Sequence, residues 1–128
     1  MMKKPFRPAA LMPFLLLSGM MLFTLHCAEN PLEPEVRKDN EIWITAEGYV
    51  PETLTVAAGT TVVWVNKDNK VQCVESVKSD GPDPEPDEKF PSSPILEPAE
   101  TYSHKFTTAG TYYYSCSITR LQGKVIVQ

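Results

Sequence analysis

The stretch TVAAGTTVVWVNKD (residues 55–68) contains the strongest fold signal in the chain. It turns at Gly59 and continues as TTVVWVN (60–66), which is apolar almost without a break. An apolar run of this length is typical of a strand buried inside a β-sandwich. We therefore place Trp64 in the core, and we expect Asn66 and Asp68 to fix the following polar turn through hydrogen bonds from their side chains to the backbone.

The segments on both sides of this stretch continue the β pattern. In GTYYYSC (110–116), Tyr112, Tyr114 and Cys116 share one face and Tyr113 the other, because side chains alternate along a strand. Further strand candidates are EIWITA (41–46), VQCVESV (71–77), TYSHKFT (101–107) and GKVIVQ (123–128). No stretch has a convincing helical period. Seven or eight short strands separated by turns predict an all-β sandwich or barrel.

The N-terminal region has the features of an export signal. Three cationic residues precede an apolar run over 15–25, which is too short to span a bilayer as a stable helix. Cys27 follows directly, in a pattern that resembles a bacterial lipobox, although His26 stands where a small residue is usual. We expect cleavage of residues 1–26, lipid on Cys27 and a place in the cell envelope, on the periplasmic or extracellular side. An ordinary cleaved signal and an uncleaved anchor are the alternatives.

Residues 27–40 are expected to be a tether between the membrane and a domain over 41–128. The whole chain has a formal net charge of −4, and loss of the signal leaves 9 basic and 16 acidic residues, a net of −7. No basic cluster remains, which excludes a nucleic-acid footprint.

One proline-rich segment departs from the strand pattern. SDGPDPEPDEKFPSSP (79–94) contains five prolines and five acidic residues. Proline cannot donate to a strand ladder, so we predict an acidic loop here. A cation site would lack the glycine-centred ligand order of calcium loops, and we favour a solvated loop. The acids in question are Asp80, Asp83, Glu85, Asp87 and Glu88.

The order of motifs resembles the cupredoxins, most closely the small plastocyanin- and amicyanin-like blue-copper proteins. The resemblance is carried by GYVPETLTVAAGTTVVWVNKD (48–68), by Phe90–Pro98, by YSHKFTTAGTYYYSC (102–116) and by GKVIV (123–127). It implies a Greek-key β-sandwich, copper held between two loops at one end, and one-electron transfer. Copper of this kind is served by two imidazoles, one thiolate and a weak axial ligand.

The ligand positions that the resemblance implies are mostly filled by other residues. Cys116 matches the thiolate, but Gln72 and Thr119 stand at the imidazole positions, and Gln122 or Leu121 at the axial one. His104 is the single histidine beyond residue 26, and no methionine follows residue 21. One chain therefore cannot assemble a centre with two imidazoles, and we interpret His104 as a sheet-face residue.

The two remaining cysteines suggest what replaced the metal. In the resembled fold, the residue after the first imidazole lies beside the copper thiolate, so the resemblance implies Cα atoms of Cys73 and Cys116 within about 7 Å and a disulfide between them. The favoured hypothesis is a metal-free binding or structural module without a cofactor, with an envelope protein as a potential partner.

The alternative is a Cu(I)-binding or electron-transfer protein that uses both thiolates. In it, Gln72 or Gln122 would add a weak oxygen contact. A loop one residue shorter than in the family would put Cys73 itself at the imidazole position. We expect no enzyme, because neither Ser115 nor Ser117 has a base partner.

Overall fold

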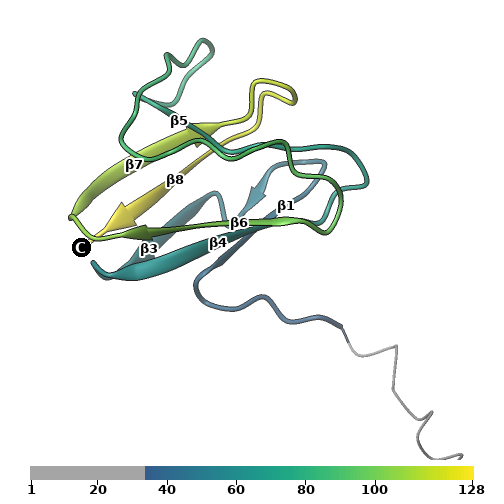
Figure 1. Cartoon of the computed structure of the whole chain (residues 1–128), viewed down its shortest axis with the longest axis horizontal. Helices are drawn as coiled ribbons and strands as arrows, with labels where there is room; N and C mark the ends of the chain where they lie inside the picture. The colour runs from purple at the N-terminus through teal and green to yellow at the C-terminus, as the bar shows by residue number, and fades with distance from the viewer. Residues whose placement is uncertain (1–33) are drawn as a thin grey trace, which may run out of the picture. The chain divides into compact units, whose positions relative to one another are not determined.

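Eight β-strands form two four-stranded sheets in residues 34–128, the part of the chain that the computed structural model describes (Figure 1). The first sheet has the order β2 (Tyr49–Val50), β1 (Glu41–Ile44), β4 (Thr60–Asn66) and β6 (Thr101–Phe106). The second has the order β3 (Thr53–Val56), β8 (Gln122–Val127), β7 (Gly110–Ser115) and β5 (Glu75–Val77). The predicted all-β sandwich is confirmed.

Residues 36–128 make up one compact unit. The expected signal, the expected lipid attachment at Cys27 and the first part of the expected tether lie outside the described residues. Within residues 34–128, no helix is long and apolar enough to cross a membrane.

Both sheets are mixed, because β1 runs parallel to β4 and β3 runs parallel to β8, while the other strand pairs are antiparallel. The core lies between the sheets and is rich in aromatic rings. Trp64 is fully buried, as expected, and its ring lies against Phe90, Tyr102, Phe106 and Tyr114. Gly59, with φ of 95°, makes the turn into β4.

Asn66 organises the turn after β4, as the sequence predicts. Its Oδ1 accepts a hydrogen bond from the backbone N–H of Asp68 at 2.9 Å. Its Nδ2 donates to the carbonyls of Lys70 and Leu96, both at 2.9 Å. The buried amide therefore ties the turn to a segment thirty residues away. It also fixes the path of the backbone that leads to Gln72.

The strand predicted over 71–77 is shorter than expected. Only Glu75–Val77 pairs as β5, whereas Gln72 forms an isolated bridge with Leu96. Val74 donates its N–H to the Ser93 side chain and accepts a hydrogen bond from the Ser93 N–H at its carbonyl. The end of the acidic loop, which we define as residues 79–94, thus supplies partners that a neighbouring strand would otherwise supply.

The middle of the acidic loop runs back along β5. Val77 and Pro86 form an isolated antiparallel bridge, and the Lys78 N–H donates to the Glu85 carbonyl at 2.8 Å. The Asp87 N–H donates to the Ser76 carbonyl at 3.0 Å. The loop therefore covers the outer edge of the second sheet, since β5 is the last strand there.

Candidate functional site

The register between β5 and β7 brings the two cysteines together. Glu75 pairs with Ser115, which brings Cys73, just before β5, beside Cys116, just after β7. The sulfur atoms are at disulfide distance and the Cα atoms are 5.0 Å apart. Both residues are buried, with exposed fractions of 5% for Cys73 and 0% for Cys116. The expected proximity is confirmed, at a sequence separation of 43.

The residues at the two implied imidazole positions contact each other directly. The Thr119 hydroxyl donates to the side-chain oxygen of Gln72 at 2.8 Å. The Gln72 amide nitrogen donates in turn to Asp68 Oδ2 at 2.9 Å. Gln72 is fully buried, so these bonds satisfy an amide that would otherwise be costly to bury.

A tight loop after β7 positions Thr119. The Arg120 N–H donates to the Cys116 carbonyl at 2.7 Å, and the Cys116 N–H donates to the Leu121 carbonyl at 3.0 Å. Arg120 has φ of 65°, a left-handed conformation that closes the loop.

The side chains of both candidates for the axial position make contacts elsewhere in the fold. Leu121 packs against the hydrophobic core. Gln122 forms two hydrogen bonds with the backbone of Gly81: its Oε1 accepts from the Gly81 N–H at 3.0 Å, and its Nε2 donates to the Gly81 carbonyl. The side chain of Gln122 therefore holds the acidic loop.

His104 lies in the other sheet, on β6, opposite Val62 of β4. Its ring contacts Phe106 edge-on, with centroids 4.7 Å apart, and Phe90 at 5.5 Å. Partial burial lowers the pKa of His104, because the charged imidazolium loses hydration there. The structure thus places this histidine among aromatic rings of the sheet face.

Glu75 is a site residue that the sequence reasoning missed. One of its carboxylate oxygens accepts a hydrogen bond from the Ser117 N–H at 2.6 Å and lies 3.3 Å from Cys73 Sγ. Within residues 34–128, Cys73, Glu75 and Cys116 form the one group of potential metal donors, with ligand atoms within 4.8 Å of one another. The period of two along 71–77 could have found Glu75, since it shares a face with Cys73.

A buried tyrosine supports the loop that carries Cys73. The Tyr49 hydroxyl donates to the Cys73 carbonyl at 2.7 Å, and its ring meets Tyr114 edge-on with centroids 4.7 Å apart. Burial strongly raises the pKa of Tyr49, so the hydroxyl keeps its proton and remains a donor.

The donor set does not fit a blue-copper ion. Such a site needs two imidazoles beside the thiolate, but the corresponding positions hold an amide and a hydroxyl that bond to each other. Cys116, the remaining ligand, is at bonding distance from Cys73.

The chain is a two-sheet β-sandwich in which a cysteine follows the penultimate strand. This cysteine lies beside the loop that follows the strand with the buried tryptophan. The combination is the one expected of a cupredoxin. A profile of the cupredoxin-like domain family matches residues 14–127, and the chain belongs to that family.

Individual relatives agree with this assignment. The chain is 33% identical over 84 residues to plastocyanin from Scenedesmus fuscus, covering 62% of this chain and 86% of that protein. A purple cupredoxin from Nitrosopumilus maritimus superposes with a TM-score of 0.62 at 30% identity, over 69% of this chain and 98% of the other. A Cu(I) structure of an amicyanin mutant gives a TM-score of 0.59 at 30% identity, over 73% and 87%.

Proposed function

We propose that this protein is an exported, lipid-anchored cupredoxin-type module in which a disulfide has taken the place of the metal. Its role is that of a metal-free binding or structural part of the cell envelope, without catalysis. The single observation that carries this proposal is the direct bond between Gln72 and Thr119, which fills with protein atoms the place where two imidazoles would face a metal.

The disulfide would hold together the two loops that a metal ion would otherwise join. A copper ion would join the loop before β5 to the loop after β7, and the Cys73–Cys116 pair joins the same two loops. In the chain-entropy picture, closing a loop of this length stabilises the folded state by about 4 kcal/mol. The fold can therefore persist without the ion.

The proposed envelope location is consistent with this chemistry. Disulfides persist in oxidising compartments such as the periplasm and are rare in the cytosol. An apolar run followed by Cys27 would deliver the domain there and attach it to a membrane. Metabolic labelling with a fatty acid tests the anchor: the native chain should incorporate label, and the Cys27→Ser variant should not.

Thiol counting together with metal analysis tests the core of the proposal. The purified protein should show no reactive thiol from Cys73 or Cys116 under denaturing conditions until a reductant is added. After incubation with Cu(II) and dialysis, it should retain no stoichiometric copper. Two free thiols without reductant, or an intense visible band from a copper–thiolate centre, would contradict the proposal.

A second candidate is a thiolate Cu(I) site, and the observation that favours it is the cluster of Cys73, Glu75 and Cys116. Reduction by a dithiol, with two electrons and two protons, would convert the disulfide into two thiols. Soft thiolates suit Cu(I), and Glu75 would lie beside them. Titration of the reduced protein against a chromophoric Cu(I) chelator tests this: one equivalent should bind, and Cys73→Ser should abolish it.

A further inference from the structure

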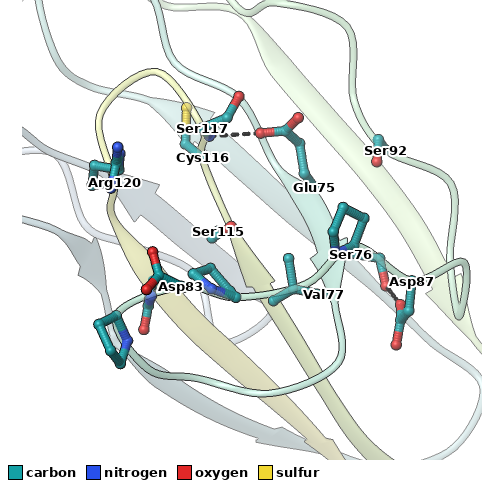
Figure 2. A pocket seen from close by; sticks show the side chains of 14 residues that line it. Glu75, Ser76, Val77, Asp83, Asp87, Ser92, Ser115, Cys116, Ser117 and Arg120 are labelled. Atoms are coloured by element: carbon teal, nitrogen blue, oxygen red, sulfur yellow. Dashed lines mark hydrogen bonds between the residues drawn. The ribbon is translucent and has the colours of Figure 1, made fainter.

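A groove lies between the acidic loop and the second sheet, next to Cys116 (Figure 2). Its volume is about 580 Å³, within the range of sites that hold small molecules. On the sheet side the groove is lined by Val77, Ser115 and Gln122. On the loop side it is lined by Pro82, Pro84 and Pro86.

The loop that covers the groove is fixed at several points. Gln122 holds Gly81 at one end through two hydrogen bonds, and the Ser76 hydroxyl donates to the Asp87 carboxylate at the other. Between them, Glu85 pairs with Lys78 at 2.8 Å. A covering loop held in this way is organised before any ligand arrives, which lowers the entropic cost of binding.

The charges around the groove are mainly negative. Glu75, Asp83 and Asp87 contribute carboxylates and Arg120 contributes one guanidinium. Two of these carboxylates already accept hydrogen bonds: Glu75 from the Ser117 N–H, and Asp87 from the Ser76 hydroxyl. Asp83 makes no hydrogen bond or ion pair with another residue of the described chain, so its carboxylate remains available to a cation.

The floor of the groove contains a polar group without a partner. Ser115 is only 6% exposed and lines the groove, and its side chain is drawn there in Figure 2. Its hydroxyl makes no hydrogen bond to another residue within 34–128. The hydroxyl is therefore free to bond to a molecule or a water in the groove.

We propose that this groove binds a small organic cation, with an amine or guanidinium group on a short apolar stem. The cationic head would pair with Asp83 and donate to Ser115, and the stem would lie along the prolines of the loop. This inference rests on the proposed binding role of the module and gives that role a class of ligand.

Calorimetric titration of the oxidised full-length protein with agmatine tests the proposal. Agmatine should bind with one-to-one stoichiometry, whereas 1,4-butanediol, which lacks both charges, should not. Asp83→Asn should weaken agmatine binding about tenfold, because the amide oxygen can still accept a hydrogen bond but the negative charge that strengthens it is lost. Arg120→Gln should strengthen it, because a like charge leaves the rim.

Glu88→Gln is the matched control. It removes the same charge from the same loop, but Glu88 does not line the groove, and screening should hold its effect within about twofold. Equal losses in Asp83→Asn and Glu88→Gln, or no agmatine binding, would overturn the groove site. Thiol counting and copper analysis on the same preparation test the metal-free module separately, so the two proposals fail by different measurements.

Discussion

The hydroxyl of Thr119 donates to the side-chain oxygen of Gln72 at 2.8 Å, across 47 positions of the chain. One residue further on from Gln72, Cys73 is cross-linked to Cys116. The same two loops are thus joined twice, by a covalent bond and by a buried polar contact. We infer that both links contribute to the stability of this end of the sandwich.

Replacement of Thr119 by valine should destabilise the fold. The substitution keeps the side-chain shape but leaves Gln72 Oε1 without its donor in a fully buried position. The expected loss is about 1–3 kcal/mol of unfolding free energy, measured by urea denaturation. Thr61→Val, at an exposed position of β4, is the control and should change stability by less than about 0.5 kcal/mol. A silent Thr119→Val would show that the contact contributes nothing.

Removal of the cross-link should cost more. The double variant Cys73→Ser/Cys116→Ser should lose up to about 4 kcal/mol, because the unfolded chain regains the entropy of a 43-residue separation. Chemical denaturation with and without reductant checks this prediction. Reductant should lower the midpoint of the native protein and leave that of the double variant unchanged. Equal midpoints for the oxidised native protein and the double variant would be the contrary result.

Gly123 should not tolerate a side chain. A Cβ atom built there would lie 2.6 Å from the Tyr114 hydroxyl oxygen and 2.7 Å from the ring carbon that carries it. Tyr114 is fully buried and cannot move aside, so Gly123→Ala should destabilise by about 1–3 kcal/mol. Lys124→Ala, at the next position of β8, should cost less than about 1 kcal/mol. Thermal melts of the two variants would distinguish a steric cause from general sensitivity of the strand.

Acid should weaken the fold partly through His104. Burial lowers its folded-state pKa below the ordinary value of 6.5. The unfolded chain therefore binds a proton more readily as the pH falls through about 6.5, and stability decreases until the folded-state pKa is passed. His104→Gln should flatten this part of the stability profile, measured as melting temperature between pH 8 and pH 5. An unchanged slope in the variant would assign the acid sensitivity to carboxylates.

Features encoded locally were predictable from the sequence. The apolar run over 60–66 identified β4 and its buried tryptophan. The alternation of 110–116 placed Tyr114 and Cys116 on one face, and both are buried in the structure. Asn66 and Asp68 predicted the turn after β4, because short polar side chains at such positions form hydrogen bonds with the backbone. The proximity of the two cysteines followed from the resemblance to the cupredoxins, since neither strand pattern carries register information by itself.

Features that depend on distant pairing were not predictable. The groove depends on the hydrogen bonds of Gln122 with Gly81, 41 positions away, and of Ser76 with Asp87. The length of β5 depends on Ser93 and Leu96, which take hydrogen bonds that a longer strand would have used. The same holds for the polar bond of Gln72, whose side chain could equally have faced a ligand.

The pairing of Gly110 with Val127 places the last residue of the chain at the end of β7 remote from Cys116. Gln128 is held there by backbone hydrogen bonds with Val56 and Ala58, each at 2.9 Å, and Figure 1 shows the C-terminus at that end. A biotinylated extension after Gln128 would therefore immobilise the molecule on a sensor chip with its cross-linked end turned toward the flowing solution.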